Sequence, residues 1–277
     1  MSATVCLLIS GLCFALVHSS VKFLPHIPAH ELVFLRAVVS TILSLGALRA
    51  ANLSPWGKNK PMLIARGLAG TAALLLYFYT LQHMPLASAV TIQYLHPILT
   101  VILAGLLLRE SPTWLQWVFF TISFAGVLLV RGFDPRVSGI DVMIGVLSAF
   151  CSSCAYTLIR MLRHEDHALV VVFYLPFVSL IVIGPFTLTH WVTPHGWDWL
   201  VILFIGVFTQ IAQYFMTKAY QADTAANISN LNYLGIVYAL MIGLIFFGES
   251  VEALALVGMG LIAFSTILST RFRKAHT

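Results

Sequence analysis

The segment from Leu86 to Leu108 constrains the fold more than any other part of the chain. It runs for more than twenty residues without a charge, which is long enough for an α-helix to cross a bilayer at about 1.5 Å per residue. Its centre nevertheless carries three polar residues and a proline: Gln93, Tyr94, His96 and Pro97. Such groups are tolerated at membrane depth where they face other protein or a water-filled cavity. We therefore expect a membrane span that borders an internal site.

A similar segment returns over residues 223–250. A shift of 139 positions places Gln93 on Asn232, Tyr94 on Tyr233, and Glu110-Ser111 on Glu249-Ser250. The coincidence predicts a single membrane domain, 1–277, built from two repeats at about 1–135 and 136–277. If each repeat holds five helices, the second enters the membrane from the opposite side. A pseudo-two-fold axis in the membrane plane then relates the halves.

The composition favours the same class of protein. The chain is 60% apolar and only 9% charged, against about 25% charged residues in soluble domains. We therefore expect an all-α integral membrane protein with ten transmembrane helices in two inverted five-helix repeats. The expected helices span residues 3–23, 30–49, 62–83, 87–108, 112–131, 140–161, 168–189, 198–218, 224–247 and 251–270.

The basic residues predict how the chain is oriented. Eleven Lys and Arg residues fall on the amino-terminal side: Arg49, Lys58, Lys60, Arg66, Arg109, Arg160, Arg163, Lys218, Arg271, Arg273 and Lys274. Only three fall on the other side, Lys22, Arg131 and Arg136. Because cytoplasmic loops carry the excess of Lys and Arg, both termini are expected in the cytoplasm and the protein in the inner (plasma) membrane.

The positions of the acidic residues limit the class of substrate. All ten lie at or near the ends of the expected helices, so no carboxylate is expected near mid-membrane. This argues against ion coupling through a buried carboxylate and against a strongly cationic substrate. The polar residues within the spans suit an amino-acid-like, aromatic or other neutral or zwitterionic metabolite.

His96 is the sharpest candidate for a substrate contact, because it shares one helix face with Gln93 and Thr100. It could also take up a proton, so proton coupling stays open. The alternative is a neutral histidine that a neighbouring helix satisfies. The complete set of expected substrate-binding residues is Tyr77, Gln93, His96, Tyr156, Gln210, Gln213, Tyr214, Asn227 and Asn230. For the amides, interhelical hydrogen bonding is the competing explanation.

Four residues are expected to have gating or structural roles. Glu110 would lie at the cytoplasmic end of the fourth helix, and its repeat counterpart Glu249 at the external end of the ninth. Arg36 lies about two turns into the second span, where it must be paired or snorkel. A structural or gating pair is favoured there over a direct carboxylate ligand. His18 lies near the external end of the first helix, as a gate or as an interfacial residue.

Metal and cofactor chemistry is not expected. Two histidine pairs, His26 with His30 and His164 with His167, have metal-compatible spacing but lack a third ligand. The Cys151-x-x-Cys154 spacing has no second pair to complete a redox or metal site, and intramembrane thiols usually act as small apolar fillers. The expected partners are a small-molecule substrate and the lipid bilayer, with no nucleic acid. A monomer and a homodimer are both open.

Several motifs resemble a known family. They are ELVFLRA around Arg36, the RGLAG…YFYTLQHMPLASAV passage from residue 66 to 90, and the Glu-Ser pairs that close the fourth and ninth helices. With ten short-looped helices, they resemble the drug/metabolite transporter superfamily, and more narrowly its EamA-type ten-helix members. The resemblance implies a central cavity between helices 1, 3, 4, 6, 8 and 9, with helices 5 and 10 peripheral.

The sequence therefore predicts a secondary transporter that moves a small organic solute by alternating access. Efflux is implied by the resemblance alone. A passive channel or facilitator is the alternative, and an integral-membrane enzyme is a weaker one. The enzyme would need a cluster such as HExxH, GxSxG or paired intramembrane carboxylates, which the sequence does not contain.

Overall fold

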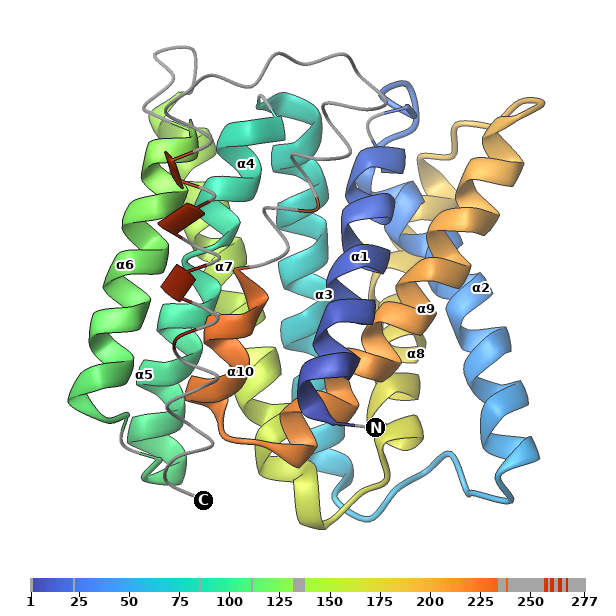
Figure 1. Ribbon diagram of the computed structural model, residues 1–277. Coiled ribbons are helices and arrows are strands. Elements are labelled where there is room, and N and C mark those ends of the chain that lie inside the picture. Colours follow the sequence, from blue (N-terminus) through green and yellow to red (C-terminus); the bar gives the residue numbers. More distant parts are fainter. Residues whose placement is uncertain are drawn as a thin grey trace.

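The computed structural model describes residues 2–21, 23–84, 86–110, 112–131 and 138–233, and the single residues 238, 257, 258, 260, 261, 264, 265 and 268. Over these residues all regular structure is helical (Figure 1). The helices are α1 (Ala3–Val21), α2 (Ala29–Ala50), α3 (Lys60–His83), α4 (Leu86–Gln93), α5 (His96–Leu108), α6 (Trp114–Arg131), α7 (Gly139–Met161), η1 (Leu162–His164), α8 (Ala168–Thr189), α9 (Asp198–Ala222) and α10 (Ala225–Asn232). Most of the expected tenth helix, most of the second half of the ninth, and Glu249 lie outside the described residues.

Six helical segments of the described chain are long and apolar enough to cross a membrane. They are Ala3–Val21, Ala29–Ala50, Lys60–His83, Gly139–His164, Ala168–Thr189 and Asp198–Ala222. Each has the length that a hydrocarbon core of about 30 Å requires of a helix. The described chain is thus an all-α, multi-pass membrane protein.

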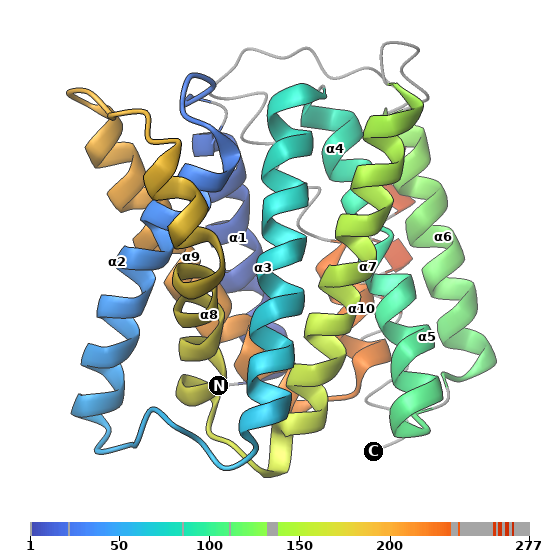
Figure 2. The same ribbon diagram turned by 180° about the vertical axis from the view of Figure 1, so that it is seen from behind.

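The helices of the two halves of the chain pack against one another. The main pairs are α1 with α9, α2 with α8, and α3 with α7, while α5 contacts both α7 and α10. Figures 1 and 2 show α2 and α6 at opposite edges of the bundle, with α1 and α3 between them. The layout leaves α1, α3, α7 and α9 to surround the middle of the molecule.

Glycine allows two further pairs of helices, α3 with α8 and α2 with α9, to approach closely. A Cβ atom on Gly67 of α3 would lie 2.6 Å from the Val178 side chain and 2.9 Å from the Tyr174 carbonyl oxygen of α8. A Cβ atom on Gly206 of α9 would lie 2.6 Å from the Val39 side chain of α2. Small residues at such points let helix backbones approach within a bilayer, where dispersion contacts drive association.

The helix expected over 87–108 is in fact two helices, α4 and α5, with a turn at Tyr94 and Leu95 between them. Pro97 occupies the first turn of α5 and explains the break. It has no N–H, and its ring clashes with the carbonyl of the residue four positions earlier, which is Gln93. The Leu95 N–H instead donates to the Ile92 carbonyl, at 3.0 Å.

One basic residue lies in a different place from that expected. Arg66 was counted with the loops, but it lies inside α3 and is only 1% exposed. Removing it leaves ten Lys and Arg residues on the amino-terminal side against three on the other, so the charge bias remains.

Candidate functional site

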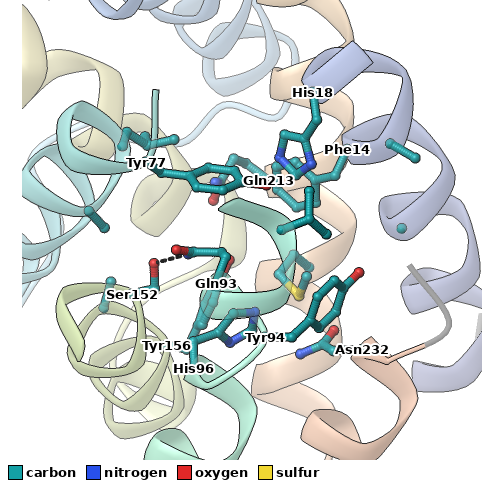
Figure 3. Close-up of a pocket in the computed structure, with 18 of the residues that line it drawn as sticks. Phe14, His18, Tyr77, Gln93, Tyr94, His96, Ser152, Tyr156, Gln213 and Asn232 are labelled. Atoms are coloured by element: carbon teal, nitrogen blue, oxygen red, sulfur yellow. Dashed lines mark hydrogen bonds between the residues drawn. The ribbon is translucent and has the colours of Figure 1, made fainter. Parts of the chain in front are cut away.

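A cavity of about 110 Å³ lies between the helices at the middle of the bundle (Figure 3). Its walls come from α1, α3, α4, α5, α7, α8, α9 and α10, together with Tyr94 and Tyr238. No residue of α6, the expected fifth helix, is among the described lining residues. The volume is below the roughly 300–1,000 Å³ of pockets for drug-sized ligands, so this conformation accommodates a small solute.

Five of the nine expected substrate-binding residues line this cavity: Tyr77, Gln93, His96, Tyr156 and Gln213. They come from α3, α4, α5, α7 and α9, so the fold brings together residues up to 136 positions apart, from 77 to 213. Figure 3 shows their side chains around a common space. These five residues therefore give the cavity wall neutral polar and aromatic groups.

Gln93 is fixed by two serines of α7. Its amide nitrogen donates to Ser152 Oγ at 2.8 Å, and its amide oxygen accepts from Ser148 Oγ at 3.0 Å (Figure 3 marks the bond to Ser152). Ser148 itself is fully buried and also approaches the Ala73 carbonyl, at 2.8 Å. These bonds hold the end of α4 against α7 and present the Gln93 amide at the cavity.

Aromatic rings make up much of the remaining wall. The His18 ring meets Tyr77 edge-on at 5.0 Å, and the His96 ring lies 5.1 Å from Tyr156. Tyr156 in turn stacks on Tyr220, at 5.0 Å between centroids. Rings in this arrangement offer both apolar faces and polar edges to a bound solute.

His96 keeps a free polar atom next to the cavity. The residue is 8% exposed, and its Nδ1 has no hydrogen-bond partner among the described residues. Its carbonyl accepts from Thr100 Oγ1 at 2.7 Å. An unpartnered buried nitrogen is costly unless a ligand or water satisfies it.

Three other expected binding residues lie outside the cavity. Gln210 donates to Ser44 Oγ of α2 at 2.7 Å, and Asn227 links Gln116 to Asp223. Tyr214 lies beneath the Lys218 ammonium, at 5.6 Å, and borders a separate groove. Successive helical residues turn by about 100°, so only Gln213 and Met216 of this stretch reach the cavity. The Asn230 side chain lies outside the described residues.

The residues that were expected to have gating or structural roles lie in different parts of the bundle. His18 lines the cavity. Arg36 is 1% exposed and forms no ion pair with any described residue, so the expected pair is not found there. Glu31, the nearby acid of the same helix, accepts instead from the Val192 N–H at 2.9 Å.

Glu110 lies at the centre of a charged cluster at one end of the bundle. Its Oε1 accepts from Arg160 Nε at 2.8 Å and from Arg163 Nη1 at 2.7 Å. Its Oε2 accepts from the Ala225 N–H at 3.2 Å, in the first turn of α10. Arg160 also donates to the Tyr220 carbonyl, at 3.4 Å. The cluster therefore joins the ends of α5, α7 and α9 to the start of α10.

The sequence analysis missed several residues of the cavity wall, notably Arg66, Tyr94, Ser152 and Asn232. Two of these had a signal. Arg66 lies eleven positions before Tyr77, about three helical turns, and so on the same face of α3. Asn232 is the repeat counterpart of Gln93. In the described part of the chain no group of three His, Cys, Asp or Glu residues could hold a metal ion.

A cavity lined by several polar and aromatic side chains inside a bundle of membrane-spanning helices is typical of small-molecule membrane carriers. The sequence model of the EamA-like transporter family matches residues 1–132 and again residues 140–271. The chain belongs to this family, and with it to the drug/metabolite transporter superfamily.

Individual relatives agree with this assignment. The chain is 30% identical to the pseudopaline exporter CntI of Pseudomonas aeruginosa, over 90% of this chain and 88% of that protein. It is 27% identical to human solute carrier family 35 member G1, over 87% of this chain and 71% of that protein. A crystal structure superposes with a TM-score of 0.83 at 18% identity, over 98% of both chains, which shows that the fold is shared.

Proposed function

We propose that this protein is a secondary transporter that carries a small organic solute by alternating access. The single observation that carries the proposal is the central cavity, where Tyr77, Gln93, His96, Tyr156 and Gln213 converge from five helices. The solute is amino-acid-like, aromatic or another neutral or zwitterionic metabolite, because these five residues contribute neutral polar and aromatic groups that suit such molecules. No described acidic residue lines the cavity, which disfavours a cationic drug.

The two halves are proposed to be inverted repeats, about 1–135 and 136–277. The two matches to the family model support this division. So does the packing, because contacts recur with their partners exchanged. Gly67 approaches Val178, while Gly206, 139 positions after Gly67, approaches Val39, 139 positions before Val178.

Hydrogen bonds between the halves show the same exchange. Ser10 of α1 donates to the Ala212 carbonyl of α9 at 2.9 Å. Ser148 Oγ of α7 lies 2.8 Å from the Ala73 carbonyl oxygen of α3. Ser148 is the counterpart of Ser10, and Ala212 is the counterpart of Ala73, at offsets of 138 and 139 positions. Such related contacts support two bundles that rock against each other around a shared site.

The Glu110 cluster is proposed to close one face of the carrier. Its bonds join α5 of the first half to α7, α9 and α10 of the second. In alternating access these bonds must break when the cavity opens to that face. The charge bias of the loops supports a cytoplasmic position for this face and for both termini, in the inner membrane. Efflux is proposed because the Pseudomonas relative is named an exporter.

The transport mode is tested by reconstituting the purified protein in liposomes and measuring the uptake of a labelled solute that stabilises it. We expect saturable uptake that accelerates when unlabelled solute is loaded on the opposite side. Uptake that rises linearly with concentration, without such counterflow, would instead establish the passive facilitator.

His96→Ala is expected to lower the transport efficiency at least tenfold, equivalent to about 1.4 kcal/mol, while the melting temperature changes little. The reason is that His96 presents an unpartnered Nδ1 beside the cavity, and its carbonyl contact to Thr100 does not depend on the ring. His83→Ala is the matched control, since His83 is exposed at the end of α3. Unchanged kinetics in the His96 variant would remove this residue from the site.

A further inference from the structure

Arg66 is a buried cation beside the central cavity. The residue is 1% exposed and belongs to the cavity wall. Its Nη2 donates to Gln213 Oε1 at 2.9 Å, but Nε and Nη1 have no hydrogen-bond partner among the described residues. The guanidinium therefore has a neutral partner and no described anionic one.

This arrangement is energetically unfavourable without a ligand. Burying an uncompensated ion in a protein costs several kcal/mol even after relaxation. A second buried guanidinium, that of Arg36 in α2, also has two nitrogens, Nε and Nη2, without a hydrogen-bond partner among the described residues. None of the described acidic residues lines the cavity or forms an ion pair with either arginine.

The fold itself does not require a charge at these positions. The repeat counterpart of Arg66 is Ile205, which is also 1% exposed, and the counterpart of its partner Gln213 is Leu74. Arg36 corresponds likewise to Leu175, again 1% exposed. One half of the molecule thus fills with apolar side chains the positions at which the other half carries guanidinium groups. A purely structural role for Arg66 leaves this difference unexplained.

The backbone next to Arg66 leaves room for the charged group. A Cβ atom on Gly70, one helical turn further along α3, would lie 2.6 Å from Arg66 Nη1 and 2.6 Å from Leu175 Cδ1. Gly70 is itself part of the cavity wall. A larger residue there would push the guanidinium away from the position it holds beside Gln213.

We propose that Arg66 binds a carboxylate group of the transported solute, so that the substrates are small organic acids or amino acids with a free carboxylate. This inference rests on the transporter proposed above. Arginine suits the role because its planar, permanently charged fork matches a carboxylate. Arg66 is the only Lys or Arg among the described lining residues, and one positive charge balances a monovalent carboxylate better than a phosphate near −2.

The test measures the melting temperature of the purified, full-length protein with matched ligand pairs. The pairs are acetate with acetamide, propionate with propionamide, and phenylacetate with phenylacetamide; phenyl phosphate is added to separate phosphate from carboxylate recognition. A ligand that binds the folded state raises its apparent stability according to its affinity. We expect at least one acid to bind at least tenfold more tightly than its amide.

The variants separate binding from folding. Arg66→Met is expected to melt at or above the temperature of the parent protein, because apolar replacement of a buried ion is often stabilising, and to lose the preference for the acid. The double variant Arg66→Met with Gln213→Leu should show the same melting behaviour and the same loss of preference for the acid. It also avoids leaving the Gln213 amide without its partner. Arg66→Lys keeps part of the preference. Arg49→Met, which removes an exposed cation at the end of α2, should leave it unchanged.

Four results would overturn the assignment: stabilisation by no acid, equal stabilisation by acid and amide, a preference that survives in Arg66→Met, or tighter binding of phenyl phosphate. A counterflow assay with the binding acid distinguishes the two proposals. An acid that binds through Arg66 but shows no counterflow contradicts the transporter and leaves the carboxylate site standing. Counterflow of a neutral solute, without any preference for acids, would support the transporter and contradict the carboxylate site.

Discussion

Gly67→Ala is expected to destabilise the protein by about 1–3 kcal/mol, because the added methyl group would overpack the contact between α3 and α8. The new Cβ atom would lie 2.6 Å from the Val178 side chain and 2.9 Å from the Tyr174 carbonyl, and a backbone carbonyl cannot rotate away. The measurement is the melting temperature of the purified protein in detergent.

The chain offers a matched control for this change. Gly46 is an exposed glycine of α2, and nothing lies within 4 Å of a Cβ atom built there. Gly46→Ala should be neutral or stabilise the helix by up to about 1 kcal/mol, since alanine has the better helix propensity. Gly206→Ala should destabilise the protein about as much as Gly67→Ala. A neutral Gly206 variant beside a destabilised Gly67 variant would contradict the repeat symmetry at this contact.

Glu110→Ala is expected to lower the initial transport rate at least tenfold. It removes the shared acceptor of Arg160 and Arg163 and the carboxylate bound to the Ala225 N–H. A loss of about 1.4 kcal/mol from the state in which this face is closed shifts its equilibrium with the open state tenfold. Individual ion pairs at exposed sites contribute about 0–1 kcal/mol, but this carboxylate is 17% exposed and accepts three donors.

The opening is measured by placing a cysteine at Ser152, in a variant without its native cysteines, and labelling it with a membrane-impermeant thiol reagent from the Glu110 side. Faster labelling in the Glu110→Ala background is the expected result. Glu165→Ala is the control, because Glu165 is exposed near the same end and accepts only from Asn59 among the bonds found for it. Equal labelling in the two backgrounds would show that the cluster does not close this face.

The residues of the cavity wall change the functional group that is expected on the substrate. The sequence placed no acid at mid-membrane, and from this we expected a neutral or zwitterionic solute. The described cavity wall agrees that no acid is present, but it adds the guanidinium of Arg66. The carboxylate recognition proposed for Arg66 applies to both zwitterionic amino acids and simple organic acids, because both carry that group. The two proposals therefore overlap and differ only in whether a solute without a carboxylate is accepted.

Helical periodicity predicted the cavity-lining residues of α9 less well than those of α3. Gln210, Gln213 and Tyr214 were all expected to bind substrate, yet only Gln213 lines the cavity, while Gln210 bonds to Ser44 and Tyr214 borders another groove. In a membrane helix, polar residues serve both ligands and neighbouring helices, and spacing alone does not separate these uses. Asn227, which links α6 to α10 through Gln116, is another example.

The sequence by itself determined the class of this protein and the approximate limits of its described spans, because a bilayer requires long uncharged runs whatever the helices later contact. It also contained the 139-position spacing that matches Gln93 with Asn232. Only the tertiary structure decided which polar groups meet, because that depends on how each helix is rotated about its axis and on its neighbours. Arg66 is the clearest case: its charge is visible in the sequence, but its burial beside Gln213, away from any described acid, follows from the packing of α3 against α7 and α8.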